Sequence, residues 1–135
     1  MAIESTLLIV KPDGVRRGLV GEVLRRVEAK GLAIDRMDLR VIDRATAEEH
    51  YGEHREKPFF EELVTFITSG PVVVARLTGD DAITCWRALM GPTDPVQSPP
   101  GSIRGDFATV ITENLVHGSD SPTSAARELK LFFGE

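Results

Sequence analysis

Residues 6–14 read Thr-Leu-Leu-Ile-Val-Lys-Pro-Asp-Gly, and this stretch begins the predicted fold. The run from Thr6 to Val10 is apolar and rich in residues that favour strands. The Pro-Asp-Gly that follows it is typical of a turn. We therefore predict a buried strand that ends at Val10 and a turn directly after it.

The next two segments have different hydrophobic periods. Val20, Val23 and Val27 recur at helical spacing, and Gly31 stands where a helix C-cap belongs. From Met37 to Val41, apolar residues alternate with charged ones. These patterns predict a helix followed by a half-buried strand.

The rest of the chain continues this alternation. Helices are predicted over residues 45–55, 60–67 and 80–90, a strand over 72–77, and a last β-prone stretch over 107–116. Proline and glycine dominate residues 91–105, which predicts a long loop of the kind that is often functional. Ser121 as N-cap and Pro122 at the first helical position open a final helix. Its apolar side is predicted to contain Ala125, Ala126, Leu129, Phe132 and Phe133.

The order of these elements contains the β-α-β-β-α-β arrangement of a ferredoxin-like sandwich. The predicted fold class is therefore α+β, with a four-stranded antiparallel sheet covered by helices and a long Pro/Gly-rich loop. A parallel, doubly wound sheet is the alternative. With 135 residues and no linker-like segment, the chain reads as one domain over residues 1–135.

Composition and charge exclude several classes of protein. The chain has 16 Lys and Arg against 21 Asp and Glu, a net charge of −5, which argues against nucleic acid as the main partner. The longest apolar runs are too short to span a bilayer. The single cysteine, Cys85, excludes an intrachain disulfide and suits a reducing cytoplasm.

Two histidines raise the possibility of zinc chemistry. Residues 50–54 read His-Tyr-Gly-Glu-His, which fits the H-x-x-E-H pattern of a zinc hydrolase with His50 and His54 as ligands. Gly52 weakens the helix that such a pair needs, and no third ligand is evident. The other reading of these residues is a face of an amphipathic helix.

A third histidine, His117, lies between an apolar run and the start of the final helix, where it is well placed for nucleophilic or acid–base chemistry. Glu128 flanks the apolar side of that helix and is placed to orient an imidazole. Lys11, Arg87 and Arg104 supply the positive charge that phosphoryl transfer needs. Neither G-x-G-x-x-G nor a Walker A loop is present, so any nucleotide is held without a glycine-rich loop.

From Thr6 to Phe133 the chain resembles the nucleoside diphosphate kinase family. The matching segments are Lys11-Pro12-Asp13-Gly14, His50-Tyr51, Lys57-Pro58-Phe59-Phe60, Thr68-Ser69-Gly70-Pro71-Val72-Val73, Gly101-Ser102-Ile103-Arg104-Gly105-Asp106-Phe107 and Asn114-Leu115-Val116-His117-Gly118-Ser119-Asp120-Ser121. The resemblance implies the ferredoxin-like fold. It also implies transfer of the terminal phosphate of ATP and other nucleoside triphosphates to nucleoside diphosphates. The expected route is ping-pong through a phosphohistidine, with broad base specificity.

The resemblance also implies roles for individual residues. His117 is the expected nucleophile, Glu128 its orienting carboxylate and Ser119 a member of the same network. Expected phosphate and active-site contacts are Tyr51, Arg87, Thr93 and Arg104; Lys11 and Asn114 are expected to hold the sugar hydroxyls, and Phe59, Leu63 and Ile111 to contact the base. Mg²⁺ is expected on the nucleotide phosphates and not on protein ligands. The resemblance further implies a homo-oligomer, a hexamer in preference to a tetramer. A noncatalytic interaction module on the same fold is a further alternative.

Overall fold

The structure, a computed structural model, describes residues 3–134. Its strands are β1 (Ile3–Val10), β2 (Ala33–Arg40), β3 (Val72–Asp80) and β4 (Val116–Gly118). Its helices are α1 (Pro12–Arg16), α2 (Val20–Lys30), α3 (Arg44–His50), α4 (Phe60–Ile67), α5 (Ala82–Met90), α6 (Ile103–Phe107) and α7 (Pro122–Phe133), with short 3₁₀ turns at Gly52–His54 and Pro95–Gln97. No described helix is long and apolar enough to cross a membrane.

The four strands form one antiparallel sheet in the order β2-β3-β1-β4. This order brings the first and last strands together, so that Ile9 of β1 lies opposite His117 of β4. The ferredoxin-like α+β prediction is confirmed, and the parallel alternative is wrong.

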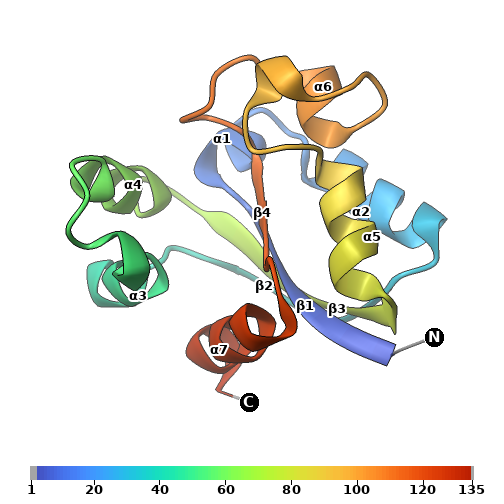
Figure 1. The fold of residues 1–135 in the computed structure, drawn as a ribbon, viewed down its shortest axis with the longest axis horizontal. Helices are drawn as coiled ribbons and strands as arrows, with labels where there is room; N and C mark the ends of the chain where they lie inside the picture. Colours follow the sequence, from blue (N-terminus) through green and yellow to red (C-terminus); the bar gives the residue numbers. More distant parts are fainter. Residues whose placement is uncertain (1–2, 135) are drawn as a thin grey trace.

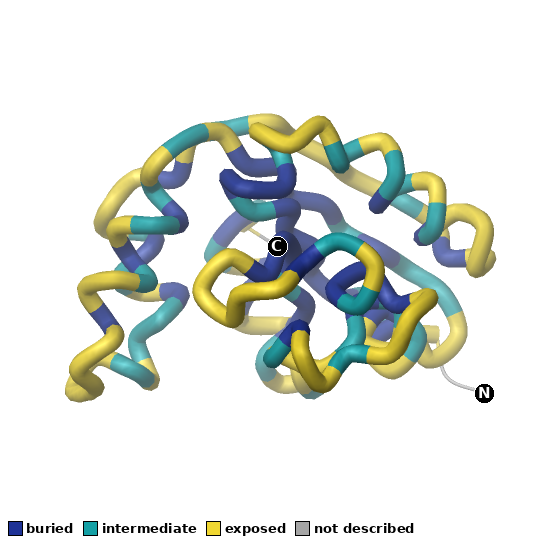
Figure 2. The backbone as a smooth tube through the Cα atoms, turned by 90° about the horizontal axis from the view of Figure 1, so that it is seen from above, coloured by how far each residue is buried: buried dark blue, intermediate teal, exposed yellow. Residues whose placement is uncertain are grey.

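Helices cover both faces of the sheet (Figure 1). On one face, Leu8 and Val10 of β1 belong to a core cluster that includes Val23 of α2 and Trp86 of α5. On the other face, β1 residues join a cluster with side chains of α3, α4 and α7. Both faces of β1 are therefore buried, as Figure 2 shows for the centre of the molecule, which explains its continuous apolar run.

Two predictions for the segments before the final helix are wrong: the long loop and the β-prone stretch that follows it. The loop over residues 91–105 contains the start of α6, where the Ser102 hydroxyl caps the helix by accepting a hydrogen bond from the Gly105 amide at 3.0 Å. The β-prone stretch over 107–116 is a strand only from Val116 onward. The chain turns sharply at Leu115, which prevents the preceding residues from pairing with β1.

The burial predicted for the second strand is also wrong. Met37, Leu39 and Val41 are 54%, 64% and 60% exposed, because β2 lies at the edge of the sheet. In α7, Ala126 is exposed although the helical pattern placed it on the apolar side. The predicted helix over residues 45–55 ends at His50 and continues as a 3₁₀ turn that begins at Gly52.

Candidate active site

His117 is held by its backbone as well as by its ring. It pairs with β1, and the indole Nε1 of Trp86 donates a hydrogen bond to its carbonyl at 3.2 Å. The next residue must be small, because a Cβ at Gly118 would lie 2.6 Å from the Trp86 ring. The sheet and α5 together fix the starting point of the His117 side chain.

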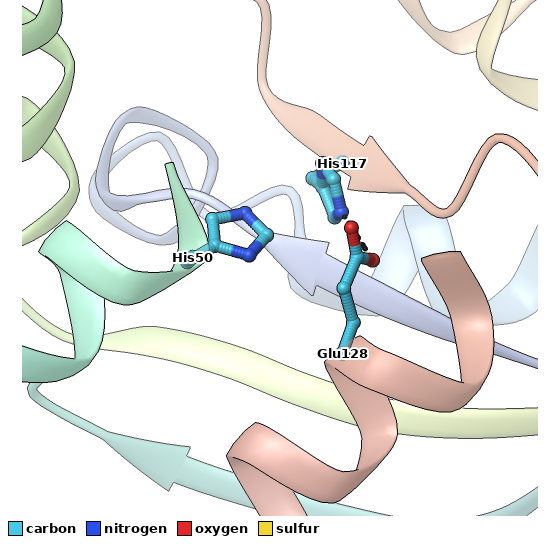
Figure 3. A group of neighbouring side chains, drawn as sticks. All are labelled: His50, His117 and Glu128. Carbon is cyan, nitrogen blue, oxygen red and sulfur yellow. Dashed lines mark hydrogen bonds and ion pairs between the residues drawn. The ribbon is translucent and has the colours of Figure 1, made fainter. Parts of the chain in front are cut away.

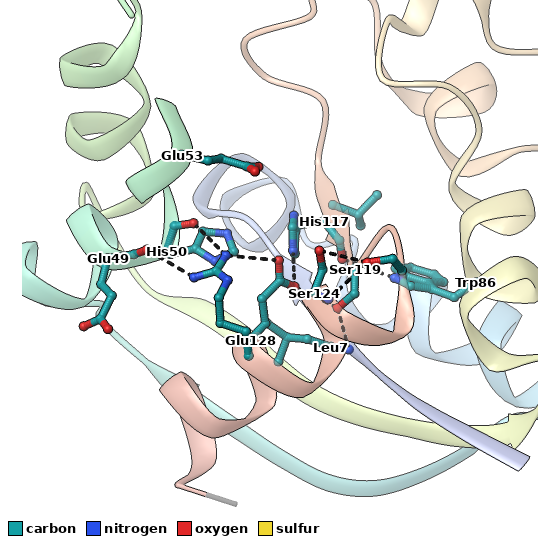
Figure 4. A network of polar contacts seen from close by, with 12 residues as sticks. Leu7, Glu49, His50, Glu53, Trp86, His117, Ser119, Ser124 and Glu128 are labelled. Carbon is teal, nitrogen blue, oxygen red and sulfur yellow. Dashed lines mark hydrogen bonds and ion pairs between the residues drawn. The ribbon is translucent and has the colours of Figure 1, made fainter. Parts of the chain in front are cut away.

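Glu128 and Ser119 fix the imidazole itself (Figure 4). His117 Nε2 lies 2.9 Å from Glu128 Oε1, and the Ser119 hydroxyl donates to the same oxygen at 2.7 Å. Ser119 in turn accepts a hydrogen bond from the Leu7 amide at 3.3 Å. Nε2 is thereby occupied by the carboxylate, and Nδ1 is the ring nitrogen that Glu128 leaves available.

The charge of Glu128 decides which tautomer this arrangement selects. Burial raises the pKa of Glu128. Hydrogen bonds from His117 and Ser119, together with the charges of His117 and His50, lower it by more, so the pKa lies below its usual value. The ionised carboxylate accepts a hydrogen bond from Nε2–H. The lone pair of the neutral ring is then on Nδ1.

His50 is the last residue of α3 and lies on the buried side of that helix. It is 4% exposed, and its ring centroid lies 4.7 Å from that of His117 in an edge-on arrangement. His54 instead contacts the ring of Phe59 at 5.5 Å. The two histidines of the H-x-x-E-H pattern thus have different neighbours.

His50, His117 and Glu128 are the group most able to hold a metal in the described part of the chain (Figure 3). Their ligand atoms lie within 4.8 Å of one another. A tetrahedral zinc site, with bonds of about 2.0–2.1 Å, needs its ligands about 3.3 Å apart. Here Nε2 and the carboxylate already share a proton, and two imidazoles are poor ligands for Mg²⁺, which prefers oxygen. The geometry fits a proton-sharing pair better than a metal site.

The buried His50 predicts a loss of stability in acid. Burial, followed by the charge of His117, lowers the pKa of His50 to about 3, with Glu128 opposing the shift. An unfolded histidine has a pKa of about 6.5, so the unfolded chain binds the proton first as the pH falls. The contribution of neutral His50 to the free energy of unfolding is fully present above pH ~6.5. Below that pH the unfolding free energy falls by about 1.4 kcal/mol per pH unit.

Urea unfolding of the wild type and His50→Phe between pH 7.5 and 4.5 measures this contribution. The unfolding free energy of the wild type should fall relative to that of His50→Phe as the pH falls, because the phenylalanine ring does not titrate. Parallel curves would show that His50 is not kept neutral by the fold.

Lys11, Asn114 and Thr93 are joined by hydrogen bonds. Lys11 Nζ donates to Asn114 Oδ1 at 2.9 Å, and Asn114 Nδ2 donates to the Thr93 carbonyl at 2.9 Å. Burial, and then the charge of Arg104, lower the pKa of Lys11 to about 8, with Asp13 opposing. The loop, α1 and the start of β4 therefore meet around Asn114.

Arg104 is more deeply buried than its place in a loop suggests. It is 6% exposed and donates to the carbonyls of Asn114, Gly91 and Val116 at 3.1, 2.9 and 2.7 Å. Burial, and then the charge of Arg87, lower its pKa to about 10. The guanidinium ties the loop to the backbone on either side of Leu115.

The remaining predicted site residues lie on or after α3, on α4 and α5, and in the segment after α6. Tyr51 follows α3 and contacts the His50 ring at 4.7 Å, and burial, with the charge of Glu128, raises its pKa. Phe59, at the N-cap of α4, is 42% exposed and has Lys57 5.7 Å from its ring centroid. Leu63 on α4 is partly buried, and Arg87 on α5 and Ile111 are exposed. The sequence reasoning missed His50 as a neighbour of His117 and treated Asp13 only as a turn residue.

Comparison with known proteins agrees with this geometry. The family model for nucleoside diphosphate kinase matches residues 4–135. The nucleoside diphosphate kinase of Rubrobacter xylanophilus (strain DSM 9941) is 61% identical over 132 residues, which cover 98% of this chain and 99% of that protein. The chain belongs to the nucleoside diphosphate kinase family. It is therefore a phosphotransferase, and neither the zinc hydrolase nor the noncatalytic module is supported.

Solved structures of nucleoside diphosphate kinases share the fold. The halophilic enzyme from Halobacterium salinarum, in complex with CDP, matches with a TM-score of 0.96 and 47% identity over 99% of this chain and 90% of its own. The apo enzyme from Encephalitozoon cuniculi matches with a TM-score of 0.96 and 36% identity over 98% of this chain and 90% of its own.

Proposed function

We propose that this nucleoside diphosphate kinase transfers the terminal phosphate of a nucleoside triphosphate to a nucleoside diphosphate through a phosphohistidine on His117. The observation that carries the proposal is the 2.9 Å contact between His117 Nε2 and the ionised Glu128. It leaves the Nδ1 lone pair free to attack.

The reaction has two mirror-image steps. In the first, Nδ1 forms a bond to the γ-phosphorus, the bond from that phosphorus to the bridging oxygen breaks, and the nucleoside diphosphate leaves with the electron pair. In the second, a β-phosphate oxygen of another nucleoside diphosphate forms a bond to the phosphorus of the phosphohistidine. The bond from that phosphorus to Nδ1 breaks, and its electron pair returns to His117. Glu128 stabilises the positive charge that develops on the ring, and Ser119 holds Glu128.

Positive charge and Mg²⁺ neutralise the phosphates in this proposal. Lys11 is half-buried and Arg104 is buried beside Asn114, and Arg87 is exposed on α5. We assign Tyr51, Thr93, Arg87 and Arg104 to the phosphates and Lys11 and Asn114 to the sugar hydroxyls. Mg²⁺ is held mainly by the nucleotide, where it supplies charge neutralisation to the transferring phosphate.

The chemistry of the phosphoenzyme tests this proposal most directly. The protein is incubated with γ-labelled ATP, freed of nucleotide and then exposed to acid or alkali. A P–N bond on His117 breaks in acid, because protonation makes the imidazole a better leaving group, and it survives alkali. A label that is stable in acid and lost in alkali would disprove the assignment and point to a serine or a carboxylate.

We also expect broad base specificity. Phe59, Leu63 and Ile111 offer apolar contact, and stacking on an aromatic ring does not distinguish one base from another. Purine and pyrimidine nucleotides, in ribo and deoxyribo forms, should have kcat/KM values within about one order of magnitude of each other. A preference of several orders of magnitude for one base in steady-state assays would contradict the assignment of these three residues to the base.

A homo-oligomer forms part of the proposal, a hexamer in preference to a tetramer. An apolar groove of about 310 Å³ lies between α2 and the sheet and is lined by Val20, Leu24, Met37 and Leu39 among others. Exposed apolar surface beside an unpaired strand favours association with another copy. The preference for a hexamer rests on the family resemblance alone. A cytoplasmic location stays a separate prediction, based on the single cysteine, Cys85.

A further inference from the structure

The chain enters β4 through an unfavourable backbone turn at Leu115. Leu115 has φ of +74°, a conformation that residues with a side chain rarely adopt. The Val116 amide donates to the Asn114 carbonyl at 2.9 Å, a bond between residues two apart that defines a γ-turn. The Leu115 side chain is fully buried, so the turn cannot relax by moving into solvent. Something else must stabilise it.

The segment after β1 contacts both polar backbone groups of Leu115. The Lys11 amide donates to the Leu115 carbonyl at 2.8 Å. Asp13 Oδ2 accepts a hydrogen bond from the Leu115 amide at 3.1 Å. Arg104 satisfies the carbonyls on either side of this residue, at Asn114 and Val116. The turn is thus held from α1 on one side and from α6 on the other.

Asp13 is buried more deeply than its place in a turn predicts. It is 3% exposed, and its second oxygen, Oδ1, has no hydrogen-bond partner among the described residues. Burying a carboxylate that is only partly hydrogen-bonded is unfavourable. α1 also approaches the turn closely, since a Cβ at Gly14 would lie 3.2 Å from the Leu115 carbonyl oxygen. The fit of this segment therefore depends on the conformation of Leu115.

We propose that Asp13 is a positioning residue for phosphate transfer, which holds Leu115 at positive φ and so places Asn114 and His117. This inference rests on the proposed function. Asn114 directly precedes the turn and His117 follows it by two residues, so a change of φ at Leu115 redirects both. Misplacing a reacting group by about 1 Å can cost about a hundredfold in rate.

The test measures the rate of phosphoenzyme formation at saturating ATP and the melting temperature. Asp13→Ala should lower the rate about tenfold to a hundredfold, whereas Asp13→Asn should stay within about threefold of the wild type, because an amide oxygen still accepts the Leu115 amide. Glu4→Ala is the matched control. Glu4 also accepts a hydrogen bond from a distant backbone amide, that of Ile83 at 3.2 Å, but from the other end of β1.

A double-mutant comparison separates positioning from simple stabilisation. Glycine adopts positive φ without help, so in a Leu115→Gly background Asp13→Ala should cost at most about threefold in rate. A residue that only stabilised the fold would lower the melting temperature equally in both backgrounds and leave the rate unchanged. If Asp13→Ala does not fold, Asp13→Glu replaces it, because the extra methylene displaces the acceptor while retaining its charge. A tenfold loss is expected there too.

Three results would overturn the inference. They are a wild-type rate in Asp13→Ala or Asp13→Glu, an equal loss in Asp13→Asn and Asp13→Ala, and an equal effect of Asp13→Ala in the Leu115→Gly background. None of them affects the acid lability of the wild-type phosphoenzyme, which tests His117 separately. Failure of this inference is therefore distinguishable from failure of the proposed function.

Discussion

Replacing His117 with alanine should lower the rate of phosphate transfer by at least about 10⁴-fold while leaving the protein folded. In the proposed mechanism the ring of His117 supplies the nitrogen that attacks phosphorus. The imidazole of His50 lies next to it but is only 4% exposed, whereas the side chain of His117 is 21% exposed. Coupled assays measure the rate, and thermal melting reports the fold.

The matched control for this substitution is His54→Ala. His54 belongs to the same chain segment as His50, yet its ring contact is with Phe59 and not with His117. It should retain most of the wild-type activity. Substantial turnover by His117→Ala, with a melting temperature near that of the wild type, would show that another residue is the nucleophile.

Glu128→Gln is expected to slow phosphoenzyme formation by about 10²-fold. The glutamine amide keeps the size of the side chain and one hydrogen-bond acceptor but removes the negative charge. In the proposed mechanism the ring becomes positively charged as Nδ1 bonds to phosphorus, and the carboxylate 2.9 Å from Nε2 would stabilise that charge. Ser119 retains a partner, so the fold should survive. Single-turnover labelling with ATP measures the rate.

Glu53→Gln makes the same chemical change on an exposed carboxylate, whose side chain is 75% accessible and lies near the same site. It should react at close to the wild-type rate. Equal rates for Glu128→Gln and the wild type would mean that Glu128 orients the ring without electrostatic assistance.

The sequence predicted best those elements whose signals are local. α2 begins at Val20 and ends at Lys30, and Gly31, which adopts φ of +97°, is the predicted C-cap. α7 begins at Pro122, and the Ser121 hydroxyl accepts a hydrogen bond from the Ser124 amide as the predicted N-cap. Such signals depend on residues within one or two turns of each other, which a single sequence displays in full.

Prediction failed where distant segments decide the outcome. The stretch before Val116 has a β-prone composition, but the chain turns at Leu115, whose backbone is hydrogen-bonded to the distant residues Lys11 and Asp13. Likewise, Met37 looked half-buried by its alternation, yet nothing in this chain covers that edge of β2 within the described residues. A period of two reports which residues share a face, and not what packs against that face.

The α+β fold, the family resemblance and the candidates His117 and Glu128 could be predicted from the sequence, since motifs and periodicities are properties of neighbouring residues. Only the folded chain shows that Glu128 meets Nε2 and not Nδ1, that Arg104 is bound by three carbonyls, and that His50 lies against the His117 ring. Hydrogen bonds, burial and the resulting pKa values depend on distances between α1, α3, β4 and α7. Those distances are set only when the sheet and both helical layers assemble.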